Sequence, residues 1–188
     1  MRSTGIVLFA LFVACAAGLS PAAASPAAFT LTSTAFADGG MIPKVHECTS
    51  GGGNDPAKKN ESPPFAWSGA PDTAKSYAII MRDLSNNNLL HWIIYDIPVS
   101  TTSLPQNVQH AYQPAVPAGA RQVYYRGSAS LYGYQGPCSP TTINTYEFVV
   151  YALNKASLTN LNANSSTQTA ARTITAASIA TARITGKS

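Results

Sequence analysis

The stretch SYAIIMRDLSNNNLLHWIIYDIP, residues 76–98, holds two apolar runs separated by a short polar loop. The first run ends at Met81. The second, from His91 to Ile97, is rich in the aromatic and β-branched residues that favour strands. A third run of this kind occupies residues 147–153. Because the apolar residues are continuous rather than alternating, we expect three central strands that are covered on both faces within a layered structure.

The flanking segments predict more strands and one helix. Residues 29–33 alternate between apolar and polar, which is typical of a half-buried strand, and residues 65–67 form a short strand before a turn. Residues 169–183 are rich in alanine and place Ile174 and Ile179 at a spacing that suits one helical face. We therefore predict a mostly β chain with a C-terminal helical segment.

The composition narrows the class of protein. Of the 188 residues, 11% are charged, against about a quarter in typical domains, and 45% are hydrophobic, enough to fill a core. Twelve basic and eight acidic residues give a formal charge of +4. This mild charge is unlike the basic stripe of a nucleic-acid-binding protein, and the low charge density is unlike a long helical bundle.

The first 24 residues are expected to be a secretory signal peptide. Arg2 supplies the positive end, residues 6–17 form an apolar run too short to span a membrane, and small residues precede the expected cleavage site after residue 24. The mature protein would then be a single exported domain, residues 25–188, secreted or periplasmic. An alternative is a lipid anchor on Cys15, because the residues before it faintly resemble a lipoprotein signal.

Two cysteines remain after that cleavage, Cys48 and Cys138. Two cysteines in an exported chain usually pair, so we predict a disulfide. It would close a loop of about 90 residues, for which the chain-entropy treatment gives roughly 4–5 kcal/mol of stabilisation. The chain has no Cys-x-x-Cys and no histidine at ligand spacing from either cysteine, so we expect no metal site.

The common catalytic motifs are missing. There is no Gly-x-Ser-x-Gly, no phosphate-binding loop and no dinucleotide fingerprint. His46 and Glu47 begin a zinc-protease pattern, but Ser50 stands where the second histidine is needed. We therefore predict that the protein is not an enzyme and uses no cofactor.

Two groups of polar residues lie at the ends of the predicted strands. Asp83 ends one strand and His91 opens the next, and the stiff loop 136–140 is followed by Asn144 and Tyr146. An imidazole, an amide and a phenol all donate hydrogen bonds, so together they could hold an anion. The alternative is that His91 is a satisfied core histidine and that the loop is only a rigid turn.

Six ordered segments carry a resemblance to a known family. They are FTLTSTAFADGGMIP (29–43), KNESPPFAWSGAP (59–71), TAKSYAIIMRD (73–83), HWIIYDIP (91–98), YGYQGPCSP (132–140) and YEFVVYAL (146–153). In this order and spacing they resemble the phosphatidylethanolamine-binding protein family, in its bacterial Raf-kinase-inhibitor-like branch.

The resemblance implies an antiparallel, sandwich-like domain with a large and a small sheet and a C-terminal helical segment. It also implies a pocket for phosphate or phospholipid head groups. Asp83, His91 and Tyr146 match the family's pocket residues of the same types, and Pro140 lies in its proline-rich loop. With Asn144 these are the expected ligand-binding residues, and the family places the loops of both cysteines near them.

Some pocket motifs of the family are altered here. Its Asp-Pro-Asp-x-Pro loop reads Asp-Leu-Ser-Asn-Asn at 83–87, and its His-Arg-Tyr reads Asn-Thr-Tyr at 144–146. The Gly-His pair near the C-terminus reads Ala-Ser at 177–178. Two histidines that could carry positive charge are thus replaced by groups that cannot, and we expect a weakened affinity for anions.

We therefore expect an exported protein that binds a small anionic ligand or a lipid head group. The alternative is a protease or kinase inhibitor or modulator that acts through a protein partner, and export favours a protease. An enzyme that uses Asp83 and His91 as an acid–base pair ranks third, because no nucleophile accompanies them. Neither a nucleic-acid partner nor a stable membrane span is expected.

Overall fold

The structure is a computed structural model that describes residues 27–49, 55–125, 131–139 and 141–188. The predicted signal peptide, residues 1–24, therefore lies outside the described residues, and so does Pro140.

Nine strands, one short 3-10 helix and one α-helix make up the described part of the chain. A small sheet has the strand order β1-β3-β6, and a larger one has the order β2-β9-β8-β4-β5-β7. Their bounds are β1 (Thr30–Thr32), β2 (Gly40–Met41), η1 (Lys44–His46), β3 (Phe65–Ser68), β4 (Ser76–Asp83), β5 (Leu89–Pro98), β6 (Ser103–Leu104), β7 (Arg121–Gln122), β8 (Thr145–Leu153), α1 (Thr167–Ala177) and β9 (Ser178–Lys187).

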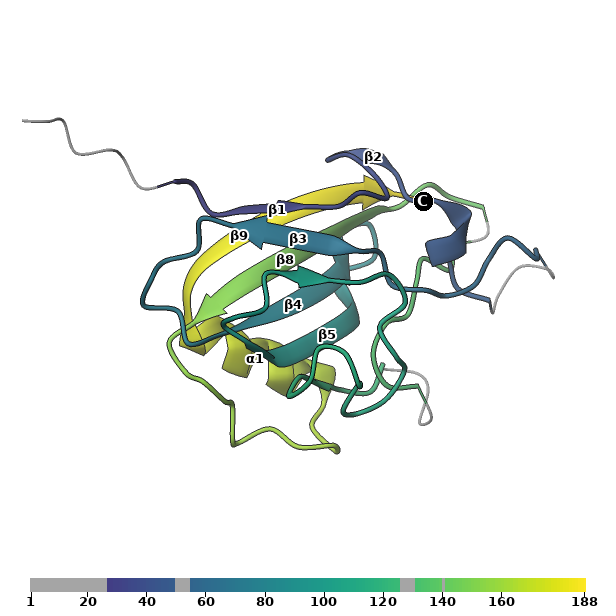
Figure 1. The fold of residues 1–188 in the computed structure, drawn as a ribbon. Helices are drawn as coiled ribbons and strands as arrows, with labels where there is room; N and C mark the ends of the chain where they lie inside the picture. The colour runs from purple at the N-terminus through teal and green to yellow at the C-terminus, as the bar shows by residue number, and fades with distance from the viewer. Residues whose placement is uncertain (1–26, 50–54, 126–130, 140) are drawn as a thin grey trace, which may run out of the picture.

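The two sheets and the helix form three layers. The small sheet lies over one face of the large sheet, and α1 packs against the other (Figure 1). Neighbouring strands are antiparallel, apart from β2, which pairs in parallel with β9. The predicted fold class, a mostly β sandwich with a helix near the C-terminus, is confirmed.

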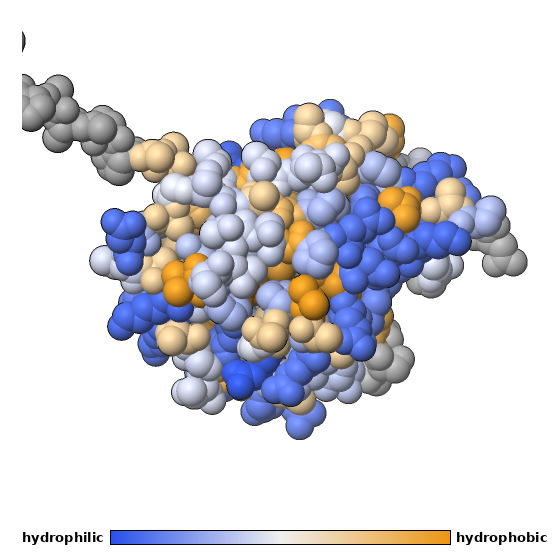
Figure 2. All heavy atoms as spheres, viewed as in Figure 1, coloured by the Kyte–Doolittle hydropathy of each residue, from blue (hydrophilic) through white to orange (hydrophobic). Residues whose placement is uncertain are grey.

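The continuous apolar runs arise because the large sheet is covered on both faces. In β4, Ile79 and Met81 join the core between the sheets, whereas Ala78 and Ile80 join the core beneath α1. All four are fully buried, since successive side chains of a strand point to opposite faces. On the exterior, Figure 2 shows that apolar residues appear as small patches among hydrophilic ones.

The predicted helix over residues 169–183 is wrong in its second half. The helix ends at Ala177, and β9 begins at Ser178 and pairs with β8 along its whole length. Residues 181–186 alternate between polar and apolar or small, which is a strand period, and Ile184 on one face is buried. Ile179, expected in the helical core face, is 39% exposed. Pairing with β8 decided the conformation of this segment.

Candidate functional site

A cavity of about 270 Å³ opens where β4 and β8 meet the start of β5. Its walls come from five separate parts of the chain: the end of β4, the hairpin loop with the start of β5, the segment after β7, the loop around the disulfide, and the start of β8. The lining residues are Asp83, Asn86, Leu89, His91, Tyr125, Cys138, Ser139, Asn144 and Tyr146.

The pairing of β4 with β5 and β8 brings Asp83, Leu89 and Tyr146 together. Asp83 at the end of β4 is the partner of Tyr146 in β8 on one side and of Leu89 in β5 on the other. The hairpin loop that joins β4 to β5 turns at Asn87 and Asn88, whose φ angles of 49° and 56° lie in the left-handed region that asparagine tolerates. The loop therefore returns the chain to the cavity within a few residues.

His91 reaches the cavity through a β-bulge. Met81 pairs with Trp92 and Arg82 pairs with Leu90, so His91 is an extra residue in β5. Regular alternation would place His91 on the helix side of the sheet, with Ile93. Its ring instead packs at a right angle on Tyr146, which belongs to the core between the sheets, with 5.4 Å between centroids. Bulges commonly redirect side chains at functional sites in this way.

The Gln135 carbonyl sets the proton arrangement of His91. The distance from Nδ1 to that oxygen is 2.9 Å, and because a carbonyl only accepts, Nδ1 must carry the proton. In the neutral ring Nε2 is then a bare acceptor. Burial lowers the pKa of His91, and the carbonyls of Gln135 and Gly136 and the charge of Asp83 oppose that effect only in part. His91 can therefore donate to an anion only after Nε2 gains a proton.

Asp83 is buried and held by two hydrogen bonds. Its Oδ1 accepts from the backbone N–H of Ser85 at 2.9 Å, and its Oδ2 accepts from Nδ2 of Asn144 at 2.8 Å. The Gln135 carbonyl, and not Asp83, orients the His91 imidazole. Asp83 acts on His91 through its charge. Asn144 lines the cavity, and its side chain also forms a hydrogen bond with the hydroxyl of Tyr146.

Tyr146 contributes a neutral phenol. Burial, together with the neighbouring Asp83 carboxylate, raises the pKa of its hydroxyl well above the ordinary value. The side chain is 1% exposed and the hydroxyl stays protonated across the physiological pH range. It therefore remains a hydrogen-bond donor, and in this structure its partner is the Asp83 carboxylate.

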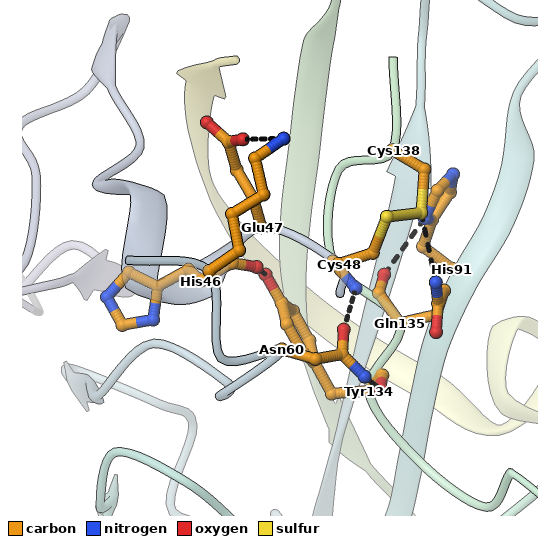
Figure 3. The surroundings of a disulfide bond; sticks show 10 residues. His46, Glu47, Cys48, Asn60, His91, Tyr134, Gln135 and Cys138 are labelled. Carbon is orange, nitrogen blue, oxygen red and sulfur yellow. Dashed lines mark hydrogen bonds and ion pairs between the residues drawn. A yellow bond between two sulfur atoms is a disulfide. The ribbon is translucent and has the colours of Figure 1, made fainter. Parts of the chain in front are cut away.

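A disulfide forms one wall of the cavity. Cys48 and Cys138 are bonded, with 5.3 Å between their Cα atoms, as predicted (Figure 3). Cys138 lines the cavity, and its Sγ accepts a hydrogen bond from Nε2 of Gln135 at 3.0 Å. The disulfide and His91 are thus both connected to the same residue, Gln135.

The segment 46–48 lies directly against the loop 134–138. The hydroxyl of Tyr134 donates to the carbonyl of His46 at 2.8 Å, and the N–H of Cys48 donates to the carbonyl of Pro137 at 2.9 Å. A Cβ atom on Gly136 would come within 2.0 Å of the His46 carbonyl oxygen, so only glycine fits there. This close packing holds the carbonyl of Gln135 in place for His91.

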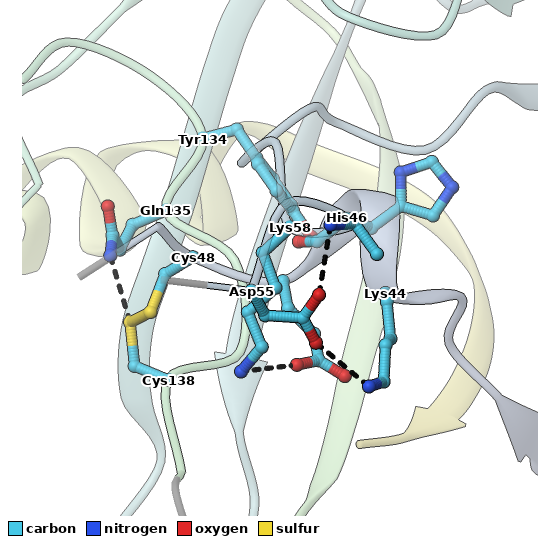
Figure 4. A network of polar contacts seen from close by, with 10 residues as sticks. Lys44, His46, Cys48, Asp55, Lys58, Tyr134, Gln135 and Cys138 are labelled. Atoms are coloured by element: carbon cyan, nitrogen blue, oxygen red, sulfur yellow. Dashed lines mark hydrogen bonds and ion pairs between the residues drawn. A yellow bond between two sulfur atoms is a disulfide. The ribbon is translucent and has the colours of Figure 1, made fainter. Parts of the chain in front are cut away.

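Two ion pairs support the segment that carries Cys48 (Figure 4). Lys58 lies 2.8 Å from Glu47, and both side chains are less than one-fifth exposed. Lys44 lies 2.9 Å from Asp55 in a more exposed pair. The Lys44–Asp55 pair is exposed and adds little, so the disulfide, the Lys58–Glu47 pair and the backbone bonds are the main constraints on this wall.

Four of the predicted ligand-binding residues therefore surround one cavity: Asp83, His91, Asn144 and Tyr146. Their role in binding remains a prediction, and the fifth, Pro140, lies outside the described residues. Asn86, Leu89 and Tyr125 also line the cavity and were not among the predicted residues. Asn86 and Leu89 lie in the hairpin between Asp83 and His91, so their positions in the sequence could have indicated them. No motif in the sequence indicates Tyr125.

The described residues hold neither a cluster of metal ligands nor a helix that could span a membrane. No three His, Cys, Asp or Glu side chains within that part of the chain are grouped as metal ligands. None of its helices combines the length and the apolar character that crossing a bilayer requires.

Comparison with known proteins assigns the chain to a family. The family model for phosphatidylethanolamine-binding protein matches residues 32–188. The UPF0098 protein YbcL of Escherichia coli is 32% identical over 167 residues, which are 86% of this chain and 88% of YbcL. A UPF0098 protein of Methanothermobacter thermautotrophicus is 36% identical over 126 residues, 66% of this chain and 76% of that protein.

Solved structures agree with the sequence relatives. The crystal structure of Escherichia coli YbcL, described as a member of the mammalian family, superposes with a TM-score of 0.73 and 29% identity, covering 86% of this chain and 98% of that one. A Chlamydia trachomatis homologue gives a TM-score of 0.67 and 27% identity, covering 86% of this chain and 97% of that one. The chain therefore belongs to the phosphatidylethanolamine-binding protein family and is a ligand-binding protein of that type.

Proposed function

We propose that the cavity at the end of β4 and the starts of β5 and β8 binds a phosphate-type anion, free or as a phospholipid head group, outside the cytoplasm. The observation that carries the proposal is the convergence of His91, Asn144 and Tyr146 on one cavity from distant parts of the chain. Each carries a donor group: the Nε2–H of protonated His91, the amide of Asn144 and the hydroxyl of Tyr146. For the last two an anion must compete with the Asp83 carboxylate, which already accepts from both.

The size of the cavity suits a head group. At about 270 Å³ it is near the lower limit of small-molecule sites, roughly 300 Å³, and too small to enclose a whole lipid. A phosphate monoester would therefore place its phosphate inside and its substituent toward the opening.

The charge of Asp83 makes the site weak for anions. Its carboxylate lies in the same wall as the donors and repels a negative ligand, and the hydrogen bonds from Ser85 and Asn144 offset this only in part. Protonation of His91 adds the one positive charge among the described residues that line the cavity. Binding should therefore depend on that proton.

We propose binding rather than catalysis. Among the described residues, no hydroxyl or thiol forms a hydrogen bond with His91, so the imidazole has no nucleophile to activate. The cysteine that lines the cavity, Cys138, is held in the disulfide. A location outside the cytoplasm is supported by that disulfide, since disulfides persist in oxidising compartments.

The test is an NMR titration of the mature protein at pH 6 with phosphoethanolamine, inorganic phosphate and ethanolamine. We expect saturable shifts at His91, Asn144 and Tyr146 with both phosphate compounds and none with ethanolamine. The variant Tyr146→Phe removes one neutral donor and should weaken binding by about fivefold, the value of a typical hydrogen bond.

The matched control is Tyr95→Phe, which deletes the same atom from a buried tyrosine that does not line the cavity. It should bind as the wild type does. The proposal is wrong if neither phosphate compound gives saturable shifts, or if ethanolamine binds as tightly as phosphoethanolamine.

A further inference from the structure

A second hollow lies on the helix side of the large sheet. It is a groove of about 480 Å³ between α1 and the ends of β4 and β5. Eight residues line it: Arg82, Asn88, Leu90, Gln168, Ala171, Arg172, Thr175 and Ala176. None of them lines the cavity of His91, so the two are separate sites.

The groove carries two guanidinium groups and no carboxylate. Arg82 comes from β4 and Arg172 from α1, so the two charges are held by different elements. Arg172 is exposed and takes part in none of the ion pairs found among the described residues. Its charge is therefore not neutralised by a neighbouring side chain.

Arg82 is only partly neutralised. Its Nε lies 3.7 Å from Oε2 of Glu147, too far for a hydrogen bond, and is buried without a hydrogen-bond partner. Its Nη2 donates to the hydroxyl of Tyr151 at 3.1 Å. Glu147 also faces Arg183, with 3.3 Å between Oε1 and Nη1, so one carboxylate serves two guanidinium groups. The surroundings of the groove thus keep a positive excess.

The rest of the groove is mainly apolar. Leu90 is half-buried against the core beneath α1, and Ala171 packs beside it. Ala176, one and a half turns further along the helix, is small and exposed. Small side chains on the helix leave the hollow open, and the amide groups of Asn88 and Gln168 lie on its walls.

We propose that this groove binds a linear alkyl carboxylate. The ionised head would lie between Arg82 and Arg172, and the alkyl chain would cover Leu90, Ala171 and Ala176. A guanidinium recognises a carboxylate through charge-assisted hydrogen bonds, and an apolar surface next to it suits a chain rather than a fully hydrated ion. A ligand with both parts is the one whose chemistry matches both halves of the lining.

The test is calorimetry at pH 7.5 with hexanoate, octanoate and decanoate, each below its micelle concentration. Binding should be saturable, with one ligand for each protein. Affinity should rise about two- to fourfold for each added methylene, up to the value of a fully buried one. Decanol has the same chain without the charge and should bind at least fivefold more weakly than decanoate.

Charge variants identify the site. Arg172→Gln should weaken decanoate binding by about three- to tenfold, the range for an exposed charge that gains a carboxylate partner. Arg183→Gln removes one positive charge beside the same Glu147 but does not line the groove, so it should leave binding within twofold. Ala176→Glu should abolish binding by repulsion, while the equally large and neutral Ala176→Gln should retain it.

His91 does not line the groove, so His91→Ala should leave decanoate binding unchanged. Decanoate binding can therefore be tested independently of the anion cavity. The inference is overturned if no saturable binding is found, if decanol binds as tightly as decanoate, if affinity does not rise with chain length, or if Arg172→Gln binds as the wild type does.

Discussion

The pH dependence of anion binding follows from the hydrogen bond between His91 and Gln135. Nδ1–H is committed to the carbonyl, so an anion can be held only after Nε2 takes up a proton. Burial lowers the pKa of His91 below its ordinary value of 6.5. In the ligand-free protein His91 is therefore mostly neutral above pH 6.5. Each further rise of one pH unit then lowers the affinity for the anion by up to tenfold, or about 1.4 kcal/mol. Between pH 6.5 and 8.5 the affinity should fall by about 50- to 100-fold.

The two tyrosines that pack on His91 do not titrate between pH 6.5 and 8.5. Burial raises the pKa values of Tyr125 and Tyr146, which pack on the ring, so both stay neutral up to pH 8.5. Sulfate is the suitable probe, since phosphate itself titrates near neutral pH. Calorimetry in two buffers of different ionisation enthalpy should report uptake of close to one proton for each sulfate bound at pH 7.5.

Two variants complete the measurement. His91→Ala should bind sulfate weakly, with no dependence on pH in this range. His110→Gln, an exposed histidine that does not line the cavity, should keep the wild-type dependence. An affinity that changes less than fivefold between pH 6.5 and 8.5 in the wild type would refute the assignment of the proton to Nε2.

Three further predictions concern the wall of the cavity and the N-terminus. Replacing both Cys48 and Cys138 by alanine should lower the free energy of unfolding in urea by about 4–5 kcal/mol, since the bond closes a separation of 90 residues; a loss below about 1 kcal/mol would contradict the chain-entropy reasoning. Gly136→Ala should lower it by about 1–3 kcal/mol, because the new Cβ would meet the backbone of segment 46–48, and unchanged stability would show that this backbone yields freely. Intact mass of the exported protein should show a chain that begins at Ser25, whereas an acylated N-terminal Cys15 would establish the lipoprotein alternative.

The sequence by itself determined the central strands. Residues 76–81, 91–97 and 147–153 are apolar apart from Ser76, His91, Asp96 and Glu147, and a sheet covered on both faces buries such runs as strands. It also predicted the disulfide, because Cys48 and Cys138 are the two cysteines that follow the expected signal peptide. Most of the candidate site followed as well, because Asp83, His91, Asn144 and Tyr146 fall at strand ends that a resemblance to the family brings together.

The tertiary structure decided the conformation of the C-terminal segment. Residues 178–183 suit a helix by composition, because alanine favours it, but an open edge of β8 offers a full row of backbone partners. Local preferences of a few tenths of a kcal/mol per residue cannot compete with such pairing, and they gave no sign of where α1 ends.

The chemistry of His91 was also decided by the tertiary structure. A bulge turns its ring from the helix side of the sheet to Tyr146, and a single inserted residue in a strand leaves no mark in an apolar run. Its proton arrangement depends on the carbonyl of Gln135, which lies 44 residues away and is held there by the contacts of Gly136 and the disulfide. Backbone carbonyls are the same in every residue, so no side-chain pattern could have predicted which one His91 would meet.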